Sequence, residues 1–178
     1  MKILTLLRHA KSGWDDPVLR DFDRPLSARG REAARRIGIE MKAQGLAFDL
    51  VLASPARRVV ETLDEVATGY GGLQPRYDER LYLAAAEALF DLVRHTPDSI
   101  ERLLLVGHNP GLEELALRLS RRSEGELRGR VETHYPTGTV AEIELPADHW
   151  ADLREGSGRV VRFIRPCDLD PELGPDGK

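Results

Sequence analysis

An arginine and a histidine stand side by side where the first apolar run of the sequence stops. The run covers residues 3–7, and Arg8 and His9 follow it directly. Two cationic or near-cationic side chains repel each other when both are charged, and burying either one without a partner is costly. The pair therefore predicts an anion near both side chains. The plain alternative is a surface pair in which Arg8 extends into water.

Two later apolar runs end in residues of the same kind. Arg58 comes shortly after the run at residues 50–53, and His108 comes shortly after the run at residues 103–106. In an open parallel sheet, ligands bind beyond the carboxyl ends of the strands. Residues that are far apart in the sequence can therefore meet there. We expect two histidines and at least two arginines to share one crevice.

Such a crevice has the groups that phosphoryl transfer requires. The guanidinium groups of Arg8 and Arg58 can bind the non-bridging oxygens, and the neutral imidazole of His9 can attack phosphorus. Histidine suits this role because its unperturbed pKa of about 6.5 leaves much of it neutral near pH 7. A protonated His108 would help to hold the phosphoryl charge. No carboxylates recur in metal-ligand spacing with the histidines, so we predict no metal and no cofactor.

Segments with helical spacing separate the apolar runs, and this alternation predicts an α/β fold with a parallel sheet. The expected helices begin after Ser27, at Ser54-Pro55, near residue 86 and at Asn109-Pro110, with Ser27, Ser54 and Asn109 as capping residues. The charged segment 121–135 contains two glycines and is expected to be a loop. Residues 139–145 and 158–166 read as the last strands.

Length and composition restrict the class of protein. The 178 residues allow one domain, expected over residues 1–167, followed by a mobile tail over residues 168–178 that is rich in Pro, Gly and Asp. The sequence contains no apolar run of membrane-spanning length and leaves no room for a signal peptide before the first strand, so we expect a cytoplasmic protein. Cys167 is the single cysteine, which excludes an internal disulfide. The net charge of −4 argues against nucleic acid or anionic membrane as a partner.

Four segments taken together resemble the histidine phosphatase superfamily, the phosphoglycerate mutase-like enzymes. They are LLRHAKSGWD, RPLSARGREAA, VLASPARRVVET and LLLVGHNPG. The short chain and the RHAKS variant are most similar to the SixA-type phosphohistidine phosphatases, as are PTGTVAEIEL, Trp150 and FIRPCDL. The resemblance extends from residue 2 to about residue 169. It implies a three-layer α/β/α fold with a mostly parallel central sheet, in a single histidine phosphatase domain.

The resemblance also implies roles for individual residues. By position, His9 matches the nucleophile of the family, and Arg8 matches the first phosphate-binding arginine. Arg58 matches the second arginine, whereas its neighbour Arg57 does not. His108 matches the second histidine, which gives it a part in catalysis and in phosphate binding.

The sequence departs from the family pattern at two positions. Ala10 replaces the glycine after the nucleophile, a small change that leaves room for phosphate. Asp15 stands where many members have asparagine, and a carboxylate facing phosphate would repel it. Glu79, in YDERLY, is the candidate general acid because mutase-like relatives keep a glutamate there. Its alternative role is that of an ordinary salt-bridging carboxylate.

The leading hypothesis is a metal-independent phosphatase that acts on phosphohistidine, on a protein, through a phosphohistidine intermediate on His9. Little chain remains beyond the expected strands and helices to build a lid, and an open site suits a phosphorylated side chain. One alternative is a small-molecule phosphomonoesterase or mutase-like enzyme of the same superfamily. Another is a non-catalytic phosphoprotein-binding module. The partner is accordingly either a phosphohistidine-bearing protein or a small phosphorylated substrate.

Overall fold

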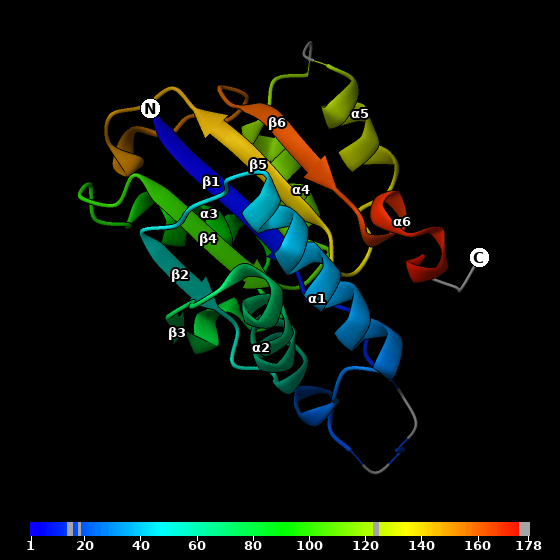
Figure 1. Cartoon of the computed structure of the whole chain (residues 1–178). Helices are drawn as coiled ribbons and strands as arrows, with labels where there is room; N and C mark the ends of the chain where they lie inside the picture. The colour runs from blue at the N-terminus through cyan, green and yellow to red at the C-terminus, as the bar shows by residue number, and fades with distance from the viewer. Residues whose placement is uncertain (14–15, 18, 123–124, 175–178) are drawn as a thin grey trace.

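A six-stranded sheet with the order β3-β2-β4-β1-β5-β6 forms the centre of the molecule (Figure 1). The computed structural model describes residues 1–13, 16–17, 19–122 and 125–174. The strands are β1 (Lys2–Arg8), β2 (Leu50–Ala53), β3 (Pro75–Tyr77), β4 (Arg102–Gly107), β5 (Val140–Leu145) and β6 (Arg159–Ile164). The four strands from β3 to β1 are parallel to one another, and β5 and β6 are added antiparallel. The predicted mostly parallel sheet is confirmed.

Helices cover both faces of this sheet. They are α1 (Ala28–Ala43), α2 (Arg57–Tyr70), α3 (Ala86–Arg94), α4 (Gly111–Leu119), α5 (Glu126–Thr133) and α6 (Pro166–Leu169). Figure 1 shows α1 and α2 in front of the sheet and α3, α4 and α5 behind it. Side chains alternate along a strand, so β1 supplies both cores: Leu4 and Leu6 pack on the α3 and α4 side, and Leu7 packs on the α1 and α2 side. The three-layer α/β/α fold is confirmed.

The first helix forms where its capping signal and apolar spacing predict it. The Ser27 hydroxyl accepts a hydrogen bond of 3.0 Å from the Gly30 N–H and so satisfies one of the free donors at the start of α1. Ala34, Ile37 and Met41 are buried on one face, as their spacing predicts. Since α1 lies between β1 and β2 in the sequence, its buried face fixes this connecting segment to the core.

The second helix begins later than predicted. Its first residue is Arg57 and its N-cap is Ala56, so the prediction that Ser54 caps this helix was wrong. The Ser54 hydroxyl accepts a hydrogen bond of 3.3 Å from the Ala56 N–H, ahead of the helix, and its other neighbour is His108. Arg58 still lies in the first turn of the helix, as predicted.

Two elements were not predicted. Residues 121–135 were expected to be a loop but contain α5, in which Val131 is the buried residue. A helix with one buried side chain lacks the apolar stripe of period 3.6 that would indicate it in the sequence. β3 is a three-residue edge strand that starts with Pro75, and so short a segment has no readable alternation.

The chain stays folded beyond the predicted domain boundary at residue 167. After α6, a 3-10 helix covers Pro171–Leu173, and Leu173 is buried. The Asp168 carboxylate pairs with Arg130 and Arg165. Residues 168–173 are therefore held by the ion pairs of Asp168 and by the burial of Leu173, while residues 175–178 lie outside the described residues. No described helix is both long and apolar enough to cross a membrane.

Candidate active site

The carboxyl ends of β1, β2 and β4 meet at one edge of the sheet and bring the four predicted residues together. Arg8 ends β1 and His9 follows it, His108 follows β4, and Arg58 lies at the start of α2. All four line one open pocket of about 310 Å³, and the ring centroids of the two histidines are 5.4 Å apart. The described lining residues are Arg8, His9, Lys11, Ser12, Asp21, Arg24, Arg58, Leu83, His108, Asn109 and Thr137.

Two other residues considered in the sequence stand apart from this set. Glu79 is exposed in the 3-10 helix Glu79–Leu81 and does not belong to the described lining, so its role as a general acid stays a prediction. Asp15 lies outside the described residues.

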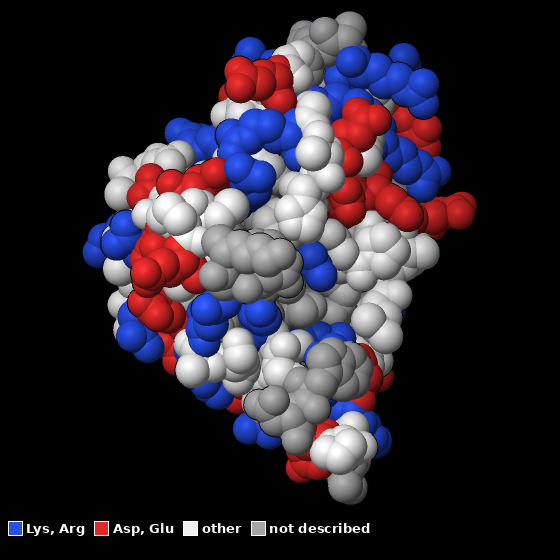
Figure 2. Space-filling model, turned by 90° about the vertical axis from the view of Figure 1, so that its right-hand side faces the viewer, with Lys and Arg blue, Asp and Glu red and all other residues white. Residues whose placement is uncertain are grey.

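Figure 2 shows the side of the molecule that is at the right in Figure 1, and basic and acidic side chains are interspersed on it. The described basic side chains on this side of the molecule form no single broad basic face.

The imidazole of His9 is held in the orientation that a nucleophile needs. Its Nδ1 lies 2.7 Å from the carbonyl oxygen of Ala10, and because a carbonyl can only accept, Nδ1 carries the proton. The lone pair is then on Nε2. Burial is the main cause that lowers the pKa of His9, and the charges of His108, Arg58 and Arg8 lower it further. The Ala10 hydrogen bond raises it, and the net result is a pKa of about 3. His9 is therefore neutral, with a free Nε2, at neutral pH.

The Thr62 side chain links the loop after His9 to Arg58. The Thr62 hydroxyl accepts a hydrogen bond of 2.9 Å from the Ala10 N–H and donates one of 2.6 Å to the carbonyl oxygen of Arg58. The loop that follows His9 is thus bound to the first turn of α2. This link sets the position of Arg58 relative to His9.

His108 is neutral in the free site as well. Arg58 donates from Nη2 to Nδ1 of His108 over 3.3 Å, so Nε2 of His108 carries the proton and donates to the Ser54 hydroxyl over 2.8 Å. Burial and the charge of Arg58 lower the pKa of His108 to about 4, although the Asp21 carboxylate opposes this shift. The expected protonated form of His108 is thus disfavoured until an anion enters the pocket, because arginines surround the ring.

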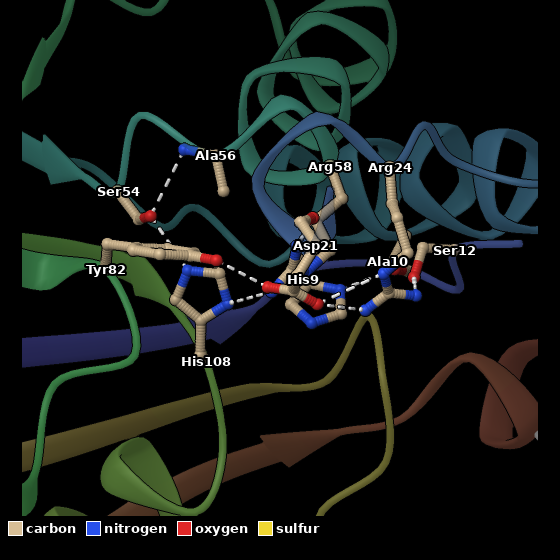
Figure 3. Close-up of polar contacts among 10 residues, drawn as sticks. All are labelled: His9, Ala10, Ser12, Asp21, Arg24, Ser54, Ala56, Arg58, Tyr82 and His108. Atoms are coloured by element: carbon tan, nitrogen blue, oxygen red, sulfur yellow. Dashed lines mark hydrogen bonds and ion pairs between the residues drawn. The ribbon is translucent and has the colours of Figure 1, made fainter. Parts of the chain in front are cut away.

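Asp21 joins the arginines on one side of the pocket (Figure 3). Its Oδ2 accepts hydrogen bonds from Arg58 Nη2 at 3.0 Å and from the Tyr82 hydroxyl at 2.6 Å, and its Oδ1 accepts from Nε and Nη2 of Arg24 at 3.1 and 3.0 Å. Partial burial raises the pKa of Asp21, but the Tyr82 and Arg24 hydrogen bonds and the charge of Arg58 outweigh it and bring it to about 2. Asp21 is therefore a fixed anion that positions two guanidinium groups.

Arg8 is held from the other side. Its Nη1 donates to the carbonyl oxygen of Tyr135 over 2.9 Å, and Asn109 donates to the same oxygen over 3.0 Å. The buried Nε groups of Arg8 and Arg58 have no hydrogen-bond acceptor in the described part of the chain. Buried donors without acceptors are rare in folded proteins. Both guanidinium groups thus carry a donor that the described residues leave unsatisfied.

Sequence reasoning missed three members of this arrangement: Asp21, Arg24 and Tyr82. A partial signal for Arg24 existed, because it opens the RPLSARG segment of the resemblance. Asp21 stands three residues before it. Tyr82 had no local signal, since its hydroxyl meets a carboxylate 61 positions away. Such contacts depend on the tertiary fold and leave no spacing pattern.

Folding stability should fall as the pH drops below about 6.5, because both buried histidines stay neutral in the folded chain. Their folded-state pKa values, about 3 and about 4, lie below the value of about 6.5 for an unfolded chain. Between these limits the unfolded chain binds more protons, so acid favours unfolding. Denaturant titrations at pH 7 and pH 5 should differ by about 2 kcal/mol for each histidine.

His9→Gln should remove about half of this pH dependence, since one of the two buried imidazoles is gone. The exposed His134 supplies the matched control, and His134→Gln should keep the full dependence. Equal stability of the wild type at pH 7 and pH 5 would contradict the assignment of both rings as neutral. Asp21 contributes only at lower pH, where its carboxylate takes up a proton between about pH 4 and pH 2.

A neutral imidazole with an unprotonated Nε2, set beside arginines at the carboxyl edge of a parallel sheet, has the groups that phosphoryl transfer requires. Comparison with known proteins agrees with this class. The model of the histidine phosphatase superfamily (branch 1) matches residues 4–82. An uncharacterized protein of Mycobacterium tuberculosis strain H37Rv is 36% identical over 162 residues, which cover 90% of this chain and 99% of the relative.

Two solved structures, both provisionally assigned as the phosphohistidine phosphatase SixA, have the same fold. The protein from Nakamurella multipartitia has a TM-score of 0.80 and 28% identity, covering 93% of this chain and 96% of its own. The protein from Agrobacterium tumefaciens has a TM-score of 0.77 and 28% identity, covering 93% and 98%. The chain belongs to the histidine phosphatase superfamily and has its phosphoglycerate mutase-like fold. It is a phosphatase, and so a hydrolase.

Proposed function

We propose that this protein hydrolyses phosphohistidine on a protein substrate through a covalent phosphohistidine intermediate on His9. The observation that carries the proposal is the His9 imidazole, whose Nδ1 proton is bound to Ala10 while Nε2 keeps its lone pair in a pocket lined by Arg8 and Arg58. Two SixA proteins of the same fold, provisionally assigned to this activity, support the substrate class.

The reaction proceeds in two displacements. The substrate ring is first protonated by solvent on the nitrogen that does not carry the phosphoryl group. Nε2 of His9 then attacks phosphorus while the bond from phosphorus to that ring breaks, and the ring departs as neutral imidazole. Water then attacks the phosphoryl group on His9, releasing inorganic phosphate and restoring the neutral ring. Arg8 and Arg58, which line the pocket, bind the equatorial oxygens, where charge is spread in the transition state. The incoming phosphoryl anion raises the pKa of His108, which then donates a proton or hydrogen bond to it.

The described lining of the pocket offers no protonated carboxyl group to serve as a general acid, and this favours an imidazole leaving group. Asp21 is the one carboxylate among the described lining residues, and with a pKa of about 2 and four hydrogen bonds it carries no proton to give. An alkoxide leaving group normally needs a general acid, worth about 10²- to 10⁴-fold in rate. An imidazole is protonated on its other nitrogen near neutral pH and leaves as a neutral molecule. The pocket therefore suits phosphohistidine better than a sugar phosphate or phosphoserine.

Metal independence is part of the proposal. The guanidinium groups of Arg8 and Arg58, together with His108, supply the positive charge that a divalent ion supplies in other phosphoryl-transfer sites. The part of the chain that the structure describes holds no group of three or more His, Cys, Asp or Glu residues with the spacing to bind a metal ion. Activity should survive dialysis against EDTA, and a large loss that one divalent ion restores would contradict metal independence.

The test is a side-by-side turnover assay with a phosphohistidine peptide, a phosphoserine peptide and a sugar phosphate. We expect the highest kcat/KM on the phosphohistidine peptide. A sugar phosphate turned over at the higher rate would replace the proposal with the small-molecule phosphomonoesterase. Failure on all three compounds would replace it with a phosphoprotein-binding module.

Glu79→Gln should change kcat on the phosphohistidine peptide by less than about tenfold, because the departing imidazole needs no acid. Glu87→Gln, at an exposed position of α3, is the matched control for loss of one surface carboxylate. The same pair of variants should be measured on a sugar phosphate, where the wild type is expected to be slow. A fast wild-type rate that collapses in Glu79→Gln alone would identify Glu79 as an acid for alcohol phosphates and overturn the choice of substrate.

A further inference from the structure

Leu83 has a backbone conformation that its side chain disfavours. Its φ of 51° makes it the only residue other than glycine with a positive φ in the described part of the chain. In this left-handed region a Cβ crowds the neighbouring carbonyl, so glycine or asparagine is the usual occupant. The Leu83 side chain is also 56% exposed, so burial does not compensate. Residues held in this way at a site are often part of its function.

The chain on both sides of Leu83 is firmly held. Before it, Leu81 is buried and the Tyr82 hydroxyl is bound to Asp21. After it, the carbonyl of Ala84 packs so tightly on α4 that a Cβ at Gly111 would overlap its oxygen. These anchors keep residue 83 in its conformation and its side chain in the lining of the pocket.

The pocket has a polar floor and one apolar side chain. Leu83 is the only aliphatic residue among the described lining residues, whereas His9 is 8% exposed and the arginines are held by hydrogen bonds. In an in-line displacement, the leaving group lies opposite the nucleophile. With the phosphoryl group bound between His9 and the arginines, the leaving group lies on the open side of the pocket, which is where an exposed side chain of the lining can meet it.

We propose that Leu83 is the specificity-determining contact of this pocket and packs against the ring of the imidazole that carries the phosphoryl group. This inference rests on the proposed function and specifies how the substrate is selected. An imidazole presents a flat ring with carbon atoms that an aliphatic side chain can cover. A sugar phosphate presents hydroxyl groups, which lose hydrogen bonds to water when they are placed against leucine.

The experiment compares two substrates that share the scissile phosphorus–nitrogen bond. A phosphohistidine peptide carries the imidazole ring, whereas phosphoramidate has no carbon atom. Leu83→Ala and Leu83→Gly should lower kcat/KM on the peptide about tenfold, the effect of removing a partly buried leucine contact. Both should change kcat/KM on phosphoramidate by less than about twofold. Leu83→Met, which keeps the apolar volume, should restore most of the activity on the peptide.

Matched variants distinguish the loss of a contact with the substrate from a loss of folding stability. Leu83→Gly suits the positive φ, so its melting temperature should equal or exceed that of Leu83→Ala. Ile39→Ala removes another exposed apolar side chain, on α1 and outside the described lining, and should leave both substrates unaffected. Equal losses on the two substrates would show that Leu83 acts through the shape of the pocket, and no loss on either would show that it makes no contact. Either result overturns the inference.

Failure of the proposed function has a different signature. It would appear in the wild type, as failure to hydrolyse either phosphorus–nitrogen compound, and the inference would fall with it. A wild type that is active on both compounds, with an unchanged ratio of the two kcat/KM values in the Leu83 variants, would reject the role of Leu83 and leave the proposed function in place.

Discussion

His9→Ala should lose at least about 10⁴-fold in kcat on a phosphohistidine peptide, the scale seen when a covalent nucleophile is removed. The wild type, quenched in alkali during turnover of a ³²P-labelled peptide, should carry label that is stable to alkali and labile to acid. His9→Ala should carry none. The reason is structural: Nε2 of His9 is the unprotonated ring nitrogen, whereas His108 directs its Nε2 proton to Ser54 and its Nδ1 to Arg58.

The control for this experiment is the exposed His134, whose replacement by alanine should leave both rate and labelling unchanged. Substrate binding should survive in His9→Ala, because Arg8 and Arg58 are held by their own hydrogen bonds and not by His9. Label that persists in His9→Ala would show that another residue is the nucleophile. Binding that disappears along with turnover would show instead that the pocket had collapsed.

Arg58→Lys should lose about 10²-fold or more in kcat/KM although the positive charge is kept. The Arg58 guanidinium donates to the backbone oxygen of Asp21 at 2.7 Å, to its carboxylate at 3.0 Å and to His108 at 3.3 Å. A lysine ammonium has three donors at one point and cannot make these planar contacts together. The loss should appear in kcat as well as in KM, since the same group orients His108.

Arg57→Lys is the matched control, one residue earlier in the same helical turn. Arg57 is exposed and pairs with Glu61 four residues on, a surface contact of small energetic value. Its replacement should change kcat/KM by less than about twofold. Circular dichroism spectra of both variants should match that of the wild type. The opposite pattern, with Arg57→Lys impaired and Arg58→Lys active, would mean that the wrong arginine has been assigned to phosphate.

The groups at strand ends could be predicted because their position follows from a general rule. Apolar runs identified β1, β2 and β4, and parallel strands bring their carboxyl ends to one edge, so Arg8, His9 and His108 had to lie close together. Arg58 followed from the helix start after β2. None of this required knowing how the loops fold.

Contacts made by loops could not be predicted in the same way. Asp21 begins the short 3-10 helix Asp21–Asp23 and Tyr82 follows the 3-10 helix Glu79–Leu81, and their contact depends on how these two segments pack in the fold. Ser54 looked like a cap because serine before proline often starts a helix, but its hydroxyl is used by His108. α5 was missed since it buries little, and residues from 168 onward looked mobile because composition does not reveal ion pairs such as Arg130 with Asp168.

The carbonyl oxygen of Tyr135 accepts hydrogen bonds from both Arg8 and Asn109, and this contact links the active site to the order in which the chain folds. Arg8 is oriented by a residue 127 positions later in the chain, after α1, α2, α3, α4 and α5 in the sequence. Contacts over such separations close a large loop and form late in folding. A chain that has folded only its first half lacks β4, which lies between β1 and β2 in the sheet, so it neither brings His9 to Arg58 nor orients Arg8. Catalytic competence therefore accompanies completion of the whole sheet, and a partly folded chain does not acquire it early.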